Sequence, residues 1–89
     1  MVRQKNPQVL HPLTETDLIQ VNMEWDESTR VWVTFVPSLN NISTFGKSYE
    51  EALDKTAETI LLYLDVAEEH GDPIPLSPRK RAQLRELLA

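Results

Sequence analysis

The triplet Gly46-Lys47-Ser48 is the first feature of the sequence that could do chemistry, because it matches the end of a phosphate-binding loop. Such a loop carries another glycine five positions earlier, and its backbone amides cradle the phosphates. Asn41 occupies that position here, and 89 residues are too few for the large parallel sheet that supports the loop. We therefore interpret Gly46 as a turn glycine and Ser48 as the capping residue of a helix.

Residues for nucleophilic, acid–base or metal chemistry are scarce. The chain has no cysteine, which excludes disulfides, thiolate nucleophiles and cysteine metal sites. Its two histidines, His11 and His70, have no second histidine or carboxylate pair at the spacing of metal ligands. The carboxylates gather on one predicted helix, and no nucleophile, base and orienting group can be combined from the sequence. We expect a protein without enzymatic activity and without a metal or other cofactor.

The charged residues form two blocks of opposite sign. Nine basic and fourteen acidic residues give a net charge of −5. Between residues 50 and 72, eight acids stand against Lys55 alone, whereas residues 79–89 contain four bases and one acid. Three prolines in residues 73–78 separate the blocks. This division indicates either two surfaces with different tasks or a solvated helix face followed by a solvated tail.

Four of the acids share one side of the predicted helix, namely Glu50, Asp54, Glu58 and Asp65. Their spacings of four, four and seven residues place them away from the apolar stripe of that helix. We predict that they face a basic partner protein. The bases Arg79-Lys80-Arg81 suggest nucleic acid, but their acidic surroundings favour contacts with the chain's own carboxylates. We expect DNA binding to be absent or weak.

Three stretches have the patterns of β-strands. Apolar and polar side chains alternate in residues 18–25. One face of this strand carries Ile19, Val21, Met23 and Trp25. Residues 30–36 are a β-branched and aromatic run, typical of an inner strand, which Pro37 ends. The short polar turn between these two strands predicts an antiparallel hairpin, and residues 42–45 predict a third strand.

Residues 48–70 predict one long helix. Ser48 and Glu51 fit a capping box, in which the Ser48 hydroxyl accepts from the Glu51 amide and the Glu51 carboxylate accepts from the Ser48 amide. The apolar stripe consists of Leu53, Ala57, Ile60, Leu64 and Ala67. Leu62 and Tyr63 widen the stripe and indicate a second apolar contact beyond the sheet. Gly71 is a stop signal.

These elements predict one α+β domain, in which a three-stranded antiparallel sheet packs against helix 48–70. The first strand should meet the stripe of that helix. Residues 1–17 are expected to be an irregular arm, and residues 77–89 a short basic helix that begins at Ser77-Pro78. No apolar run approaches the roughly 20 residues of a membrane helix, and nothing resembles a secretory signal. We expect a cytoplasmic protein.

The apolar residues of the two helices predict self-association. They are Leu61, Leu62, Tyr63, Leu84, Leu87 and Leu88. One thin core cannot bury all of them, which favours a homodimer or tetramer. The alternative is that both sets pack inside one monomer.

An ordered set of short motifs runs through residues 19–78: Val36-Pro37-x-Leu39, then Gly46-x-Ser48-x-x-Glu51-Ala52-Leu53, then Gly71-x-Pro73-Ile74-Pro75. In this order they resemble the HicB-type antitoxins and their stand-alone relatives, over about two thirds of the chain. The motif residues with structural roles are Pro37, Gly46, Ser48, Glu51, Ala52, Gly71 and Pro73. Three departures are visible: Asn41 replaces a loop glycine, the 18-residue lead-in is longer than usual, and the eleven residues after Pro78 are too few for the DNA-binding domain that full-length antitoxins append.

The resemblance implies a partial ribonuclease-H-like domain over residues 18–76, without the catalytic carboxylates. Ile74–Leu76 would add a fourth strand, since family members extend the sheet there. The function implied is neutralisation of a small basic mRNA-cleaving toxin of the HicA type. Two alternatives stay open: a solitary relative that acts as an oligomeric adaptor or ligand-binding module, and a residual nuclease, against which the few strand carboxylates argue.

Overall fold

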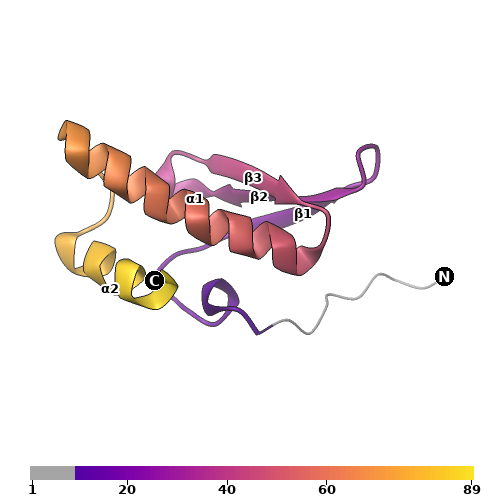
Figure 1. Ribbon diagram of the computed structural model, residues 1–89, viewed down its shortest axis with the longest axis horizontal. Coiled ribbons are helices and arrows are strands. Elements are labelled where there is room, and N and C mark those ends of the chain that lie inside the picture. The colour runs from indigo at the N-terminus through magenta and orange to yellow at the C-terminus, as the bar shows by residue number, and fades with distance from the viewer. Residues whose placement is uncertain (1–9) are drawn as a thin grey trace.

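The computed structural model describes residues 10–89. In chain order its elements are η1 (Pro12–Thr14), β1 (Asn22–Asp26), β2 (Val31–Val36), η2 (Pro37–Leu39), β3 (Ile42–Gly46), α1 (Tyr49–His70) and α2 (Pro78–Leu88), where η denotes a 3-10 helix. The strands form one antiparallel sheet in the order β1-β2-β3, and α1 lies across it (Figure 1). The predicted α+β class, with one long helix and a short C-terminal helix, is confirmed.

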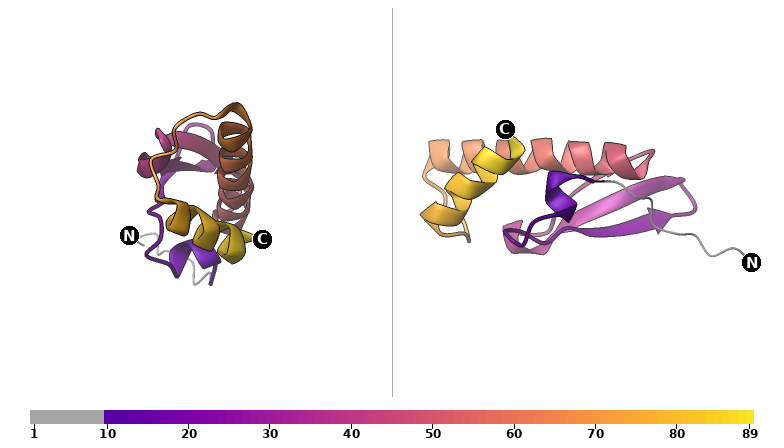
Figure 2. Two further views of the ribbon diagram at one scale, coloured as in Figure 1. Left: turned by 90° about the vertical axis from the view of Figure 1, so that its left-hand side faces the viewer. Right: turned by 90° about the horizontal axis from the view of Figure 1, so that it is seen from below.

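The sheet and α1 form two layers, and α2 and η1 close one side between them (Figure 2). The core consists of Leu13, Ile19, Val36, Leu39, Leu53, Ile60, Leu64 and Leu84. The predicted stripe of α1 supplies three of these residues, all with no exposed surface. The sheet, α1, α2 and the segment that contains η1 therefore all contribute side chains to the core.

The central strand β2 decides which face of the sheet is buried. Thr34 and Val36 are buried and Trp32 is half-buried, and these alternate residues share one face. Inside the core, the Thr34 and Thr56 hydroxyl oxygens lie 2.7 Å apart, and Thr56 donates to the Ala52 carbonyl at 2.6 Å. Since Thr56 uses its proton there, Thr34 is the donor to Thr56. This bond joins β2 to α1 with both hydroxyls satisfied.

The first strand is shorter than predicted, and its tryptophan is not buried. β1 begins at Asn22 rather than at residue 18, although Ile19 still reaches the core. Trp25 keeps 42% of its surface exposed, with its ring edge-to-face on Trp32 at 5.6 Å. Trp32 in turn meets Tyr49, the first residue of α1. Trp25 lies on an edge strand, where it contacts the Trp32 ring and its indole nitrogen donates to Glu27 at 2.8 Å.

The described part of the segment before β1 is irregular apart from one short 3-10 helix, but it packs against the domain. Residues 1–9 of the predicted arm lie outside the described residues, but residues 12–14 form η1. Leu13 is buried in the core, and His11 caps η1 by accepting the Leu13 amide on Nδ1 at 3.1 Å. This segment belongs to the domain because it supplies a core leucine.

The predicted fourth strand at Ile74–Leu76 does not form. Within residues 10–89 the sheet has three strands, and the Leu76 amide donates to the Ile74 carbonyl at 2.8 Å in a tight local turn. The prolines at 73 and 75 have no amide hydrogen to give to a neighbouring strand. Ile74 and Leu76 instead pack, partly buried, against the core.

Both ends of α1 are capped, but the capping box differs in one partner. The Ser48 hydroxyl accepts from the Glu51 amide at 3.0 Å, as predicted. The Glu51 carboxylate accepts from the amide of Lys47, at 2.6 Å, and not from that of Ser48. At the other end Gly71 adopts a left-handed φ of 69°, as expected for a stop signal.

Gly46 allows α1 to approach the end of β3. A Cβ atom on this residue would lie 2.8 Å from the Ala52 Cα and the Glu51 carbonyl carbon, and closer still to the Ala52 nitrogen. All three atoms belong to the backbone of α1, so a rotamer change cannot relieve the clash. The motif residue Gly46 thus has no side chain because the backbones of β3 and α1 meet there.

We predict that Gly46→Ala lowers the free energy of unfolding by about 3 kcal/mol, since the helix must move away from the sheet. Gly71→Ala is the matched control: its Cβ would meet nothing within 4 Å, and only the left-handed φ is unfavourable. The free energy of unfolding of that variant should fall by about 1 kcal/mol. Urea unfolding followed by circular dichroism measures both, and an equal loss would contradict the close contact.

Asp26 predicts a local pH dependence in the β1–β2 turn. Its Oδ1 accepts from the Ser28 hydroxyl at 2.9 Å and from the Ser28 amide at 3.0 Å. Hydrogen bonds from the side chains of Ser28 and then Thr29 hold the pKa of Asp26 below its ordinary value. The turn is therefore stabilised above the unfolded-state pKa of aspartate, and this stabilisation is lost as pH falls through the lower folded-state pKa.

Ser28→Ala should raise the pKa of Asp26 toward its ordinary value, because the hydroxyl donor is gone. Carboxyl-carbon chemical shifts followed through an acid titration measure it. Ser43→Ala on β3 is the control and should leave the titration of Asp26 unchanged; a Ser28→Ala curve that overlays the wild type would refute the assignment.

Candidate functional site

The four predicted carboxylates lie on the outward side of α1, and all four residues are exposed. The structure separates them into two kinds. Asp54 and Asp65 contact other segments of the chain. Glu50 and Glu58 have no polar partner among residues 10–89. The sequence predicted the acidic side of the helix but not which of its carboxylates are paired.

Asp54 holds the N-terminal segment on α1. Its Oδ1 lies 3.0 Å from Nε2 of His11. Because Nδ1 of that ring accepts the Leu13 amide, Nε2 carries the proton and donates it to the carboxylate. The Asp54 side chain nevertheless keeps 63% of its surface exposed, so one oxygen edge still faces solvent.

Asp65 and Glu68 hold α2. Arg85 contacts Asp65 at 2.7 Å and Glu68 at 2.8 Å, and Arg81 approaches Glu68 at 3.6 Å. The hydrogen bond to Asp65 is the main cause that raises the pKa of the Arg85 guanidinium. The expectation that the basic cluster contacts the chain's own carboxylates is confirmed for Arg81. Arg79 and Lys80 have no carboxylate partner within the described residues.

Of the four predicted carboxylates, those that stay open therefore lie on the N-terminal half of α1. Glu50, Asp54 and Glu58 follow one another at successive helical turns. The nearest cation on this half, Lys55, lies 4.0 Å from Glu51 and 5.6 Å above the ring of Phe45, which draws it toward β3. A basic surface approaching this half of α1 would meet carboxylates first.

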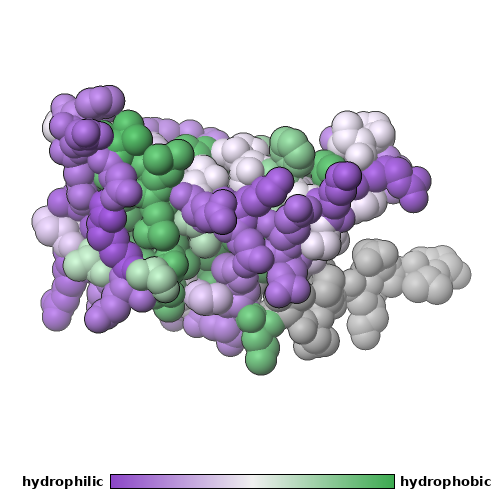
Figure 3. Space-filling view, in the orientation of Figure 1, coloured by the Kyte–Doolittle hydropathy of each residue, from purple (hydrophilic) through white to green (hydrophobic). Residues whose placement is uncertain are grey.

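An apolar groove lies on the side of α1 that faces β3. It encloses about 520 Å³ and is lined by Ile42, Thr59, Leu62, Tyr63, Val66 and Pro73, among others. Leu62 and Val66 remain 62% and 41% exposed. Figure 3 shows apolar surface gathered over the C-terminal half of α1 and over α2, with hydrophilic residues on either side. The sequence indicated a second apolar contact here, but not the groove.

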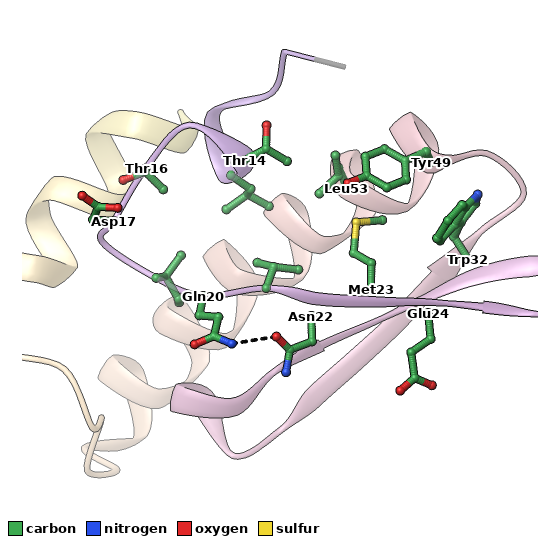
Figure 4. A pocket seen from close by; sticks show the side chains of 13 residues that line it. Thr14, Thr16, Asp17, Gln20, Asn22, Met23, Glu24, Trp32, Tyr49 and Leu53 are labelled. Atoms are coloured by element: carbon green, nitrogen blue, oxygen red, sulfur yellow. Dashed lines mark hydrogen bonds between the residues drawn. The ribbon is translucent and has the colours of Figure 1, made fainter. Parts of the chain in front are cut away.

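A larger, more polar cavity of about 890 Å³ runs along the free edge of β1 (Figure 4). Met23, Tyr49 and Leu53 point into it from β1 and α1, whereas Glu24 points away from the helix. At its rim the Gln20 amide donates to Asn22 at 2.8 Å. Within residues 10–89, no group of three or more histidine, cysteine or acidic side chains is arranged to hold a metal ion.

Several motif residues begin or cap a helix of the fold. Pro37 opens η2 directly after β2, and Ser48, Glu51 and Gly71 cap α1. Asn41, which stands where the HicB-type antitoxins that the motifs resemble have a loop glycine, adopts a left-handed φ of 55°. Asparagine tolerates this region better than most residues, so the turn forms without glycine.

No family model, curated protein or solved structure matches the chain. Neither helix within residues 10–89 combines the length and the apolar run that crossing a bilayer requires. The resemblance to HicB-type antitoxins accordingly rests on the motif residues and stays a prediction.

We predict that α2 is held by its leucine more than by its ion pairs. Leu84 has no exposed surface, so Leu84→Ala should lower the free energy of unfolding by about 3 kcal/mol. Arg85 and its two carboxylates are partly exposed, so Arg85→Ala should lower it by about 1 kcal/mol or less. Urea titration measures the free energy of unfolding of both variants. A larger decrease for Arg85→Ala than for Leu84→Ala would contradict the prediction.

Proposed function

We propose that the chain is a HicB-like antitoxin domain, which binds a small basic mRNA-cleaving toxin of the HicA type and neutralises it without chemistry. The observation that carries the proposal is the outward side of α1, where Glu50 and Glu58 are exposed and unpaired within the described residues. The motif order of the sequence supports the same family. The cytoplasm is the compartment in which such a toxin would meet its mRNA.

The physical mechanism is electrostatic attraction followed by occlusion. A protein that holds RNA phosphates carries a basic surface. A row of carboxylates raises the rate at which such a surface is encountered and orients it on arrival. Once bound, α1 would cover the groups that contact RNA, so that substrate is excluded.

The four candidate residues have unequal roles in this proposal. Glu50 and Glu58 are free to pair with toxin cations. Asp54 can contribute its solvent-facing edge while it keeps His11. Asp65 already pairs with Arg85 and adds mainly to the field. Of the apolar residues that predicted self-association, Leu84 is buried in the core and only Leu62 is exposed, so a homodimer or tetramer stays a prediction.

Co-expression tests the proposal. The adjacent reading frame is examined for a small basic protein, which is expressed alone and together with this chain. The antitoxin assignment predicts that growth stops with the toxin alone and recovers with both, and that the two proteins purify as a complex. Failure of both recovery and co-purification would leave the solitary oligomeric adaptor as the better assignment.

The charge of α1 should control the association rate. Replacing Glu50 and Glu58 by glutamine should slow association with the toxin by about tenfold at low ionic strength. The difference should nearly disappear in 1 M salt, where the Debye length is only about 3 Å. Stopped-flow fluorescence measures the rates.

The double variant Glu24→Gln/Glu86→Gln carries the same change in net charge away from this face. It should associate at nearly the wild-type rate. If both double variants slow association equally, net charge rather than the α1 face controls the encounter.

A further inference from the structure

The groove beside α1 combines exposed apolar groups with a rim of carboxylates. Leu62 and Val66 occupy successive turns of one helical row, and Glu58 lies one turn before Leu62 in that row. Asp65 and Glu69 follow Leu62 by three and seven residues, and Asp72 lines the far end of the groove. Apolar surface thus meets negative charge along the outer edge of the groove.

A hydrogen bond holds one of the side chains that line the groove. The Tyr63 hydroxyl accepts from the Asn40 side chain at 2.9 Å, which fixes the ring against the η2–β3 turn. Ile42 of β3 and Pro73 after α1 also line the groove. A preformed apolar concavity of about 520 Å³ lies within the size range of sites that bind ligands or side-chain anchors.

Neither the described chain nor a second copy is a suitable occupant. Ser77 to Ala89 are already docked, with Leu84 in the core and Arg85 on Asp65. Two copies joined through this groove would bring like rims together, and opposed carboxylates are repulsive. The lysine nearest the groove along α1, Lys55, is drawn toward Phe45.

We propose that this groove binds an apolar side chain of a basic partner, from a segment that places lysine or arginine beside its apolar anchor. The anchor contacts Leu62 and Val66, and the cations of the segment pair with Glu58, Glu69 and Asp72. This inference rests on the proposed function and names the place on α1 where the basic toxin docks. It assigns the affinity of the complex to the groove and the encounter rate to the carboxylates.

A synthetic amphipathic peptide is the first probe, with leucines along one helical face and lysines beside them. Amide chemical shifts of the full ¹⁵N-labelled chain should change around Leu62, Val66 and Asp72. Leu62→Ser should weaken binding by roughly tenfold or more, because a leucine contact is lost. Leu10→Ser replaces an even more exposed leucine outside the groove, 87% exposed against 62% for Leu62, and should leave the affinity unchanged.

Two control peptides separate the two components. A peptide with glutamates in place of the lysines should not bind, because the carboxylate rim repels it. A peptide with serines in place of the leucines should not bind, because it has no apolar side chain for the groove. Glu58→Gln should weaken binding in a salt-dependent manner, whereas Glu24→Gln on the opposite face of the sheet should not. Shift changes located elsewhere, or equal effects of matched variants, would overturn the proposal.

The toxin co-expression distinguishes this inference from the proposed function. If the wild-type chain neutralises the toxin and Leu62→Ser/Val66→Ser does so with equal affinity, the groove is not the docking site although the antitoxin assignment stands. If the wild-type chain neutralises no toxin, the assignment itself fails. Shifts of Leu62 and Val66 that depend on protein concentration alone would show that a second copy occupies the groove, and would refute the proposal.

Melting curves control for folding. Both substituted side chains are exposed, so the Leu62→Ser and Leu62→Ser/Val66→Ser variants should have nearly the same melting temperature as the wild type. The milder change Leu62→Ala provides a second measurement and should weaken peptide binding to an intermediate degree. An unchanged affinity in a folded Leu62→Ala variant would likewise contradict the anchor role.

Discussion

The close approach of α1 to the sheet is the constraint on which the rest of the structure depends. The backbones of β3 and α1 meet at Gly46 and Ala52, where no Cβ fits on the strand side. One turn further, the hydroxyls of Thr34 and Thr56 join the layers inside the core. This buried hydrogen bond forms only when the two layers lie close enough for both threonine side chains to meet. Together this bond and the glycine contact fix which side of α1 is inward, and therefore which side carries charge.

The outward side of α1 has to stabilise the domain and remain available for binding. A three-stranded sheet and one helix leave the core open at one side, and Leu13 and Leu84 close it from segments at the two ends of the described chain. His11 and Arg85 place those segments by pairing with Asp54 and Asp65. Half of the acidic face thereby serves folding. The carboxylates left over define the part of the face that can attract a partner.

Charge and apolar surface lie next to each other on this helix, and they act over different distances. Carboxylates attract a basic surface over about one Debye length, which is roughly 8 Å at physiological ionic strength. Once the complex has formed, a solvent-exposed ion pair adds only about 0–1 kcal/mol to its stability. Leu62 and Val66 act only on contact, where burial of apolar surface stabilises a complex. A binding face that contains both can select a basic partner during the encounter and retain it afterwards.

The sequence by itself determined the hairpin, the third strand, the long helix and the α+β class, because each depends on a local hydrophobic period and on nearby capping residues. The acidic face and the stop at Gly71 followed from the same local patterns. Only the tertiary structure decided which carboxylates are free, since the partner of Asp54 lies 43 residues away and that of Glu68 lies 17 residues away. The exposure of Trp25, the turn at Ile74–Leu76 and the burial of Leu13 were also decided there. Each depends on what lies opposite a residue in space, and no period in the chain encodes that.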